Sequence, residues 1–206
     1  LVALTTGFSN STLGSGTLDS NTTGSQNCAF GVDALGANVG GGDNCAFGYQ
    51  ALDAANASSN SAFGSQALGT CTSGSLNSAF GATAMFALST ASSNSAFGFG
   101  ALDSLDTANN NSAFGVNALT SVVSGAGNSA FGVNALSLNT AASNSAFGND
   151  ALAANTSGAR NNAFGIQALS AISTANDSTA FGFVALANDT GGSNSAFGSG
   201  AADAIT

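Results

Sequence analysis

Few residues of this chain could do chemistry, and they belong to two types. The chain has 10 acidic residues, all of them Asp, together with 3 Cys, no His and no Glu. Without His there is no imidazole for general acid–base catalysis, for a catalytic triad or for metal binding. The Asp residues do not recur in the reproducible pairs that carboxylate-based hydrolysis needs. We therefore predict no catalytic residue, no cofactor and no enzymatic activity.

Two acidic segments are the remaining candidates for metal binding. The segment Gly40-Gly41-Gly42-Asp43 is similar to a calcium-binding nonapeptide, but it occurs once and at the wrong period. Asp103 and Asp106 could bind Ca²⁺ weakly, although we favour a solvated loop as the interpretation of that pair. We predict no metal site beyond such weak Ca²⁺ binding.

An internal repeat determines which structural elements hold these Asp and Cys residues in place. The tripeptide Ala-Phe-Gly recurs at intervals of 16 or 17 residues, and Ala stands four residues after every one of these Phe residues. Leu usually comes next, and Asn usually stands three residues before Phe. The segment from Asn10 to Gly14 is a decayed copy upstream. The repeated Phe residues are Phe30, Phe47, Phe63, Phe80, Phe97, Phe114, Phe131, Phe147, Phe164, Phe181 and Phe197.

The length and pattern of the repeat predict an all-β fold, a parallel β-solenoid or β-roll. Sixteen or seventeen residues are too few for a helix pair, but they suit one coil with two or three short strands. Ser-Ala-Phe alternates as a half-buried strand does, and Gly permits a tight corner after it. About 12 stacked coils would make a rod of roughly 55–60 Å. We predict one domain over residues 1–206, with degenerate first coils at 1–26 and full repeats at 27–206.

Stacking turns each repeated residue into a column along the rod. We favour an interpretation in which both the Phe and the Leu columns point inward. The rival interpretation places Ala and Gly inside a very tight coil and the Phe column outside, where it would need a partner. The Asn column either hydrogen-bonds along its length, as stacked amides do, or simply tolerates a turn backbone.

The cysteines fall at informative positions of the repeat. Cys28 and Cys45 take the place of Ser in two successive coils, so they should be stacked neighbours. A disulfide between them is one candidate, and two buried thiols that stand in for Ser are the other. Cys71 lies in a variable arc without an equivalent partner, so at least one thiol stays free or forms an intermolecular bond.

The charge balance excludes two classes of partner. The formal net charge is −9 and Arg160 is the single basic residue, so the chain lacks the basic surface that nucleic acid or anionic lipid requires. No apolar run approaches the ~18 residues of a membrane span. Arg160 either forms an ion pair with a neighbouring residue or has no special role.

The nonapeptide Asn-Ser-Ala-Phe-Gly-x-x-Ala-Leu, as at Asn60 to Leu68, supports a family resemblance. It resembles the Asn-Thr-Ala-hydrophobe-Gly-x-x-Ala-Leu repeats of bacterial and phage surface proteins, which often precede an endosialidase-type chaperone domain. More distantly, it is similar to the heads of trimeric autotransporter adhesins. The resemblance implies a left-handed β-roll, an extracellular or cell-surface location, frequent trimers, and a role as a fibre or adhesive head.

The function we expect is a structural subunit of an extracellular filament that grows by end-to-end stacking of coils. The chain itself is then the partner, and the predicted polymer interface comprises Leu1, Val2, Leu4, Ala204 and Ile205. The alternative is an adhesin or phage tail-fibre segment that binds a host surface or glycan. Ice binding is a minor alternative. It would need a column of Thr on one face, and the Thr residues of this chain are scattered.

Overall fold

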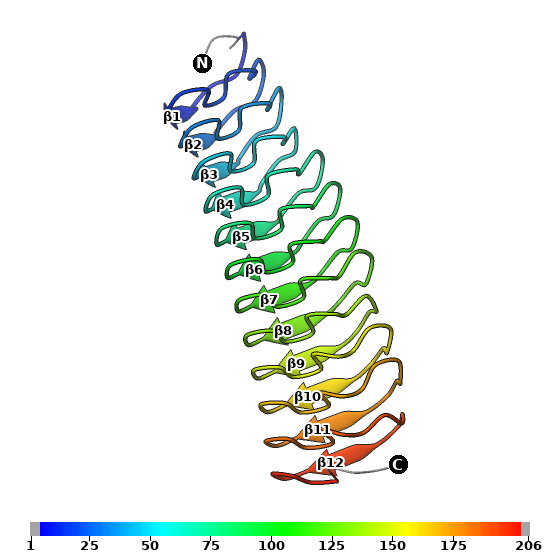
Figure 1. Cartoon of the computed structure of the whole chain (residues 1–206). Helices are drawn as coiled ribbons and strands as arrows, with labels where there is room; N and C mark the ends of the chain where they lie inside the picture. The colour runs from blue at the N-terminus through cyan, green and yellow to red at the C-terminus, as the bar shows by residue number, and fades with distance from the viewer. Residues whose placement is uncertain (1–4, 203–206) are drawn as a thin grey trace.

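A computed structural model describes residues 5–202 and shows a β-solenoid. Its strands form one 12-stranded parallel sheet in which every strand neighbours the one before it in sequence. Figure 1 shows the coils stacked in one direction, from the blue end of the chain to the red end. The predicted all-β solenoid is confirmed.

Each coil contributes one strand of three residues to this sheet. The prediction of two or three strands in each coil is therefore wrong, because the rest of the coil consists of turns and bends. The strands are β1 Ser11–Leu13, β2 Cys28–Phe30, β3 Cys45–Phe47, β4 Ser61–Phe63, β5 Ser78–Phe80, β6 Ser95–Phe97, β7 Ser112–Phe114, β8 Ser129–Phe131, β9 Ser145–Phe147, β10 Asn162–Phe164, β11 Thr179–Phe181 and β12 Ser195–Phe197.

The register of the sheet places equivalent residues directly beside one another. Phe97 of β6 pairs with Phe114 of β7, and the decayed copy at Leu13 pairs with Phe30 in the same way. Coils of 16 and 17 residues keep this register, because the missing residue is lost from the variable arc between Leu and Asn. Every repeated residue therefore forms a column along the rod.

Left-handed backbone positions turn the chain around each coil. In the coil of β7, Asn110, Asn117 and Leu119 have φ angles of 61°, 55° and 53°, and Gly115 has a φ of 142°. A left-handed conformation costs a residue such as Leu roughly 1–2 kcal/mol. The cost is offset because the Leu119 side chain is fully buried, which stabilises by roughly 2 kcal/mol. Its N–H also donates to the Ala135 carbonyl at 3.0 Å.

The core of the rod is narrow and is filled mainly by Ala and Leu. Ala113 of β7, Ala118 and Leu119 are each fully buried, and so are their equivalents in most coils. A further interior column, three residues after Leu, varies in type and includes Leu105, Val122 and Ile172, all buried. In β2 to β12 the central Ala of the strand takes the inward position, where the narrow core suits a small side chain.

The prediction that the Phe column points inward is wrong. Successive strand residues face opposite sides of a sheet, so the buried Ala113 sends Ser112 and Phe114 outward. Strands β2 to β6 and β8 to β12 have the same alternation, with a buried central Ala and a partly exposed or exposed Phe. The Leu column is buried as predicted. The rival interpretation is confirmed in placing Ala inside and Phe outside, but it is wrong for Gly, because the Gly after each Phe is not buried.

Candidate functional site

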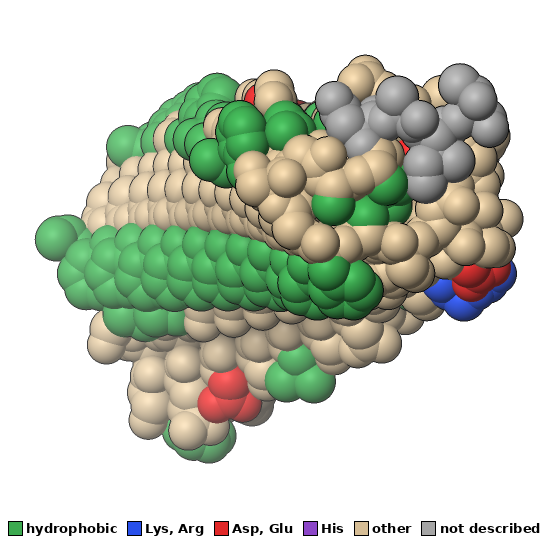
Figure 2. Space-filling view, turned by 90° about the horizontal axis from the view of Figure 1, so that it is seen from below, with side chains coloured by type: hydrophobic (Ala, Val, Ile, Leu, Met, Phe, Trp, Pro, Cys, Tyr) green, Lys and Arg blue, Asp and Glu red, His purple; other side chains and the backbone are tan. Residues whose placement is uncertain are grey.

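The Phe column is the candidate functional site, because it forms an unbroken apolar stripe on the outside of the rod. Ten successive ring pairs have centroids 4.4 to 5.2 Å apart and planes within 8° of parallel. Figure 2 shows the stripe as a green ridge along the molecule. Because each ring covers the faces of its neighbours, the column presents ring edges to solvent.

We define the Phe face as the surface formed by each repeated Phe, the residue two before it and the residue two after it. The residue two before Phe is Ser, Cys, Asn or Thr, all with short side chains. In most coils the residue two after Phe is apolar and exposed. The exposed apolar residues at that position are Val32, Tyr49, Phe99, Val116, Val133, Ile166 and Phe183.

The Phe face carries no charge. None of the ten Asp residues and not Arg160 stands between three residues before a repeated Phe and two residues after it. The charges lie at other positions of the coil, as Asp33, Asp53 and Asp106 do. The rod therefore has one uncharged apolar face, and its acidic residues lie at the other positions of the coil. The positions of the charges on the repeat are the sequence signal that marks this face.

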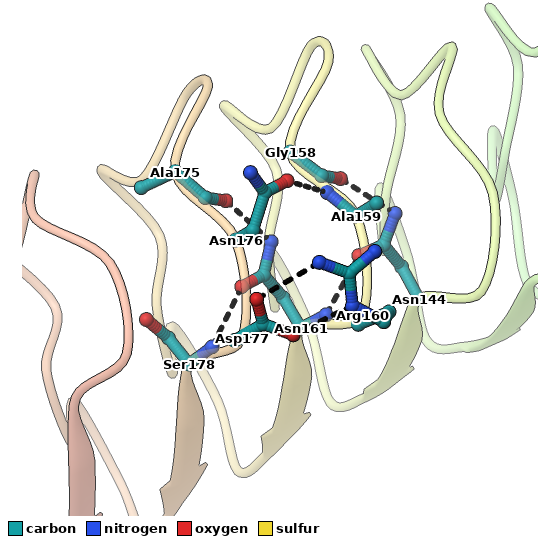
Figure 3. Close-up of polar contacts among 9 residues, drawn as sticks. All are labelled: Asn144, Gly158, Ala159, Arg160, Asn161, Ala175, Asn176, Asp177 and Ser178. Carbon is teal, nitrogen blue, oxygen red and sulfur yellow. Dashed lines mark hydrogen bonds and ion pairs between the residues drawn. The ribbon is translucent and has the colours of Figure 1, made fainter.

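A buried asparagine ladder holds the Phe strands in place. Asn144 accepts the N–H of Asn161 at its Oδ1, at 2.9 Å, and donates from Nδ2 to the Gly158 carbonyl at 2.8 Å. Asn161 repeats both bonds with the N–H of Ser178, at 3.0 Å, and the Ala175 carbonyl, at 2.8 Å. Figure 3 shows these bonds running from coil to coil. Of the two interpretations of the Asn column, hydrogen bonding along its length is the one that is confirmed.

Arg160 forms an ion pair with the coil that follows it. Its Nε donates to Asp177 Oδ1 at 2.6 Å and its Nη2 donates to Oδ2 at 2.9 Å. The bond from Arg160 lowers the pKa of Asp177, and the same bond raises the pKa of Arg160. Figure 3 shows the pair beside the Asn ladder. Both side chains are largely exposed, so the pair contributes little to stability.

The structure places Cys28 and Cys45 directly opposite one another in β2 and β3. Both are half-buried free thiols on the Phe face. Burial, and then the neighbouring Cys28, raises the pKa of the Cys45 thiol. Cys71 lies instead in the interior column, where burial raises its pKa to about 11. The predicted stacking of Cys28 on Cys45 is confirmed, whereas a disulfide between them stays a prediction.

Mild oxidation is expected to link Cys28 to Cys45 within one chain. Adjacent strands lie ~4.8 Å apart, a separation that disulfide geometry accepts. The reaction should accelerate as the pH rises, because the thiolate is the attacking species. Intact mass and thiol counting after denaturation should find Cys71 as the one remaining thiol. The Cys45→Ser variant should form no link within the chain; an intramolecular disulfide in that variant, or three thiols in the oxidised parent, would contradict the prediction.

A shallow pocket lies on the side of the coil that carries Asp53. Its volume is about 180 Å³, and it is lined by Gln50, Asp53, Gln66, Gly69, Thr70 and Phe86. Burial, and then the nearby charge of Asp33, raises the pKa of Asp53. A single carboxylate with two amides and a hydroxyl offers no pair of groups for acid–base catalysis.

Asp103 is the acidic residue least well accommodated in its surroundings. Its Oδ1 is buried and accepts no hydrogen bond from the described residues, and burial raises its pKa. Asp106, three residues away, accepts a hydrogen bond from the Ser89 hydroxyl at 2.6 Å. Within residues 5–202, no three His, Cys, Asp or Glu side chains lie close enough to hold a metal ion. Weak Ca²⁺ binding by Asp103 and Asp106 stays a prediction.

Replacing Asp103 with Asn is expected to raise the melting temperature by about 1–3 °C at pH 7. Because the folded-state pKa of Asp103 is raised, its ionised form destabilises the fold, and stability is lost as the pH rises through that pKa. The gain should therefore disappear below the ordinary Asp pKa of about 3.9. Thermal unfolding between pH 3 and 8 tests this. Asp106→Asn is the control and should give no gain; an equal gain in both variants would argue against the assignment.

The predicted polymer interface lies outside the described residues. Leu1, Val2, Leu4, Ala204 and Ile205 belong to the segments that the structure leaves undescribed, so their role stays a prediction. Over the described part of the chain, no helix has the length and hydropathy that crossing a membrane would require.

The site and fold together define the class of protein, a β-solenoid repeat protein with an uncharged aromatic face. Comparison with protein family models, with characterised proteins and with solved structures found no match. The resemblance to bacterial and phage surface repeats therefore stays a prediction based on the nonapeptide.

Proposed function

We propose that this chain is a structural subunit of an extracellular fibre, which grows as the last coil of one copy stacks on the first coil of the next. The observation that carries the proposal is that every coil meets its neighbour through the same contacts. A surface that matches itself in this way can add another copy without a new interface, and a head-to-tail contact of this kind builds a filament.

Three columns supply the repeated contact. Phe97 stacks on Phe114 at 4.6 Å, and the N–H of Gly115 donates to the Phe97 carbonyl at 2.8 Å. On the opposite edge of the same coil, which faces the next coil, the N–H of Ser112 donates to the Asn128 carbonyl at 2.9 Å. Because each coil offers acceptors and donors on both edges, a coil from a second copy could make the bonds that a coil of the same chain makes.

The adhesin alternative depends on the arcs between Leu and Asn, which vary in sequence while the columns stay constant. Such arcs are held on a regular scaffold and could bind a host surface or a glycan. Sugar binding through the Phe face is disfavoured, because aromatic side chains bind sugars with ring faces that are covered here. A glycan array separates the adhesin from the fibre, and thermal hysteresis tests the minor ice-binding alternative. The absence of enzymatic activity and the extracellular location remain part of the proposal.

Electron microscopy of the purified chain tests the fibre directly. We expect filaments with an axial repeat of ~4.8 Å, the strand spacing. In β2 to β11 the N–H two residues before Phe donates to a carbonyl of the next coil, that of Asn or, once, of Ser178, and Ser195 occupies the donor position in β12. Ser195→Pro removes this donor and should leave folded rods without filaments, whereas Ser195→Ala should still form them. Unassembled rods from the parent chain, or filaments from Ser195→Pro, would refute end-to-end growth.

A further inference from the structure

The Phe face has no partner within the described chain, although it is apolar along the whole rod. We propose that a second copy of this chain packs against it, so that two rods lie side by side and parallel, each covering the Phe face of the other. This lateral pairing goes beyond the proposed fibre and does not require end-to-end growth. It concerns the outer surface of the sheet, whereas growth concerns the two ends.

The distribution of charge favours a second copy on this face alone. Two chains that each carry a net charge of −9 repel one another when acidic surfaces meet. The Phe face is the surface from which every Asp residue is absent, so two copies can approach there without placing carboxylates opposite one another. Such an arrangement directs association toward one face and suppresses it on the others.

The orientation of the rings argues against cations and sugars as the occupant. Cations bind the negatively polarised face of an aromatic ring. Within the column those faces are covered by neighbouring rings at 4.4 to 5.2 Å, so the exposed surface consists of ring edges. Edges and neighbouring aliphatic side chains such as Val116 and Ile166 favour an apolar partner.

The length and the repeat of the face suit two rods that lie side by side. The ring-to-ring steps from Phe30 to Phe197 together span about 47 Å. Across the rod, the face follows the three-residue strand and then turns the Gly corner to the residue two after Phe. The two copies also share the same axial repeat, so their ridges and side chains can remain in register along the whole rod.

The relief of the face determines the orientation of the pair. The Phe column stands out as a ridge (Figure 2), and the side chains two residues before Phe are short, so they form a lower band beside it. A two-fold axis parallel to the rods places the ridge of each copy over the low band of the other, as in dry interfaces between paired sheets. A two-fold axis across the rods would set ridge against ridge, so we assign the parallel arrangement.

The first experiment measures molar mass by light scattering and sedimentation as the concentration is raised. All chains carry Ser195→Pro, which blocks end-to-end growth, and this 19.5 kDa chain should shift toward a particle of about 39 kDa. The double variant Val116→Asp with Val133→Asp adds charge at exposed positions of the Phe face and should weaken the dimer at least 30-fold. The matched control Val123→Asp with Leu138→Asp adds the same charge in the same two coils but off the face. All four residues are 42 to 51% exposed, so both variants should keep the circular dichroism of the parent.

The second experiment tests the parallel arrangement with the native cysteine of the low band. In a Cys45→Ser chain, Cys28 is the one thiol on the face, and Cys71 is fully buried. In a parallel pair the two Cys28 residues lie within about 10 Å, and in an antiparallel pair they lie at opposite ends of the rods. A bis-maleimide with a spacer of about 10 Å should therefore cross-link the parallel dimer in high yield.

Each outcome bears on the proposal separately from the fibre. A monomer at every concentration, or equal weakening of the dimer by both double variants, would overturn lateral pairing. A stable dimer that the reagent fails to cross-link would overturn the parallel arrangement. If the Phe-face variant abolished binding of the monomeric chain to phospholipid vesicles instead, the face would belong to a lipid surface and not to a second copy. Ser195→Pro should remove filaments while preserving the lateral dimer, so failure of end-to-end growth is distinguishable.

Discussion

Replacing Gly115 with Ala should destabilise the solenoid by about 4 kcal/mol or more, because the new Cβ would have to occupy space that the next coil fills. That atom would lie 2.4 Å from the carbonyl oxygen of Gly132, which is backbone and cannot move aside without breaking the register. The φ of 142° at Gly115 adds backbone strain for any residue with a side chain. Urea unfolding followed by circular dichroism measures the loss.

Gly127→Ala is the matched control for this prediction. Gly127 also has a positive φ, of 70°, but a Cβ there would meet no atom within 4 Å. Asn110 and Ser143 occupy the equivalent position in neighbouring coils, so a side chain is accommodated. The control should cost about 1 kcal/mol, the strain of a left-handed Ala alone. Similar losses in the two variants would show that backbone strain, and not coil spacing, makes the Gly column necessary.

Replacing Asn94 with Ala should cost about 3–5 kcal/mol, the second largest effect that we expect. Asn94 Oδ1 accepts the N–H of Asn111 at 2.9 Å, and its Nδ2 donates to the Ala108 carbonyl at 3.0 Å. Both groups would be left unpaired inside the rod, and an unsatisfied buried polar group costs roughly 1–3 kcal/mol. The measurement is equilibrium unfolding, with amide hydrogen exchange to show whether the coils beside Asn94 open first.

Two further variants separate the ladder from the general cost of removing an amide. Asn94→Ser should lose less than Asn94→Ala, because Ser178 occupies the same column and its hydroxyl accepts the N–H of Asn194 at 3.4 Å. Asn149→Ala removes an exposed amide two residues after a repeated Phe and should stay within about 0.5 kcal/mol of the parent. Equal stability of Asn94→Ala and Asn149→Ala would contradict a stabilising ladder.

The repeat alone was sufficient to predict the architecture. A period of 16 or 17 residues, with a constant Ala-Phe-Gly and all length changes in one arc, leaves stacked coils as the simplest arrangement. The hydrogen-bonded Asn column was predictable as one of two alternatives, because a repeated polar residue either bonds along its column or tolerates a turn backbone. The neighbouring positions of Cys28 and Cys45 followed from the same register.

The direction of the Phe column was not predictable from hydrophobicity. The alternation in Ser-Ala-Phe separates Ala from Phe but does not say which one faces inward, and the larger apolar residue is the natural choice for a core. The cross-section of the coil determines that Phe points outward. Left-handed turns at positions such as Asn117 and Leu119 close the coil too tightly for an inward ring. A left-handed Leu is rare, so no propensity rule would have predicted that turn.

The stacked rings make the rod a one-dimensional array of chromophores. The chain has 15 Phe, one Tyr and no Trp, so replacing Tyr49 with Phe removes the one other aromatic emitter. Rings held 4.4 to 5.2 Å apart and within 8° of parallel are close enough for their excited states to couple. The folded rod should therefore show red-shifted, excimer-like phenylalanine emission that separate rings in an unfolded chain lack. This phenylalanine emission would report whether the coils of the protein are stacked.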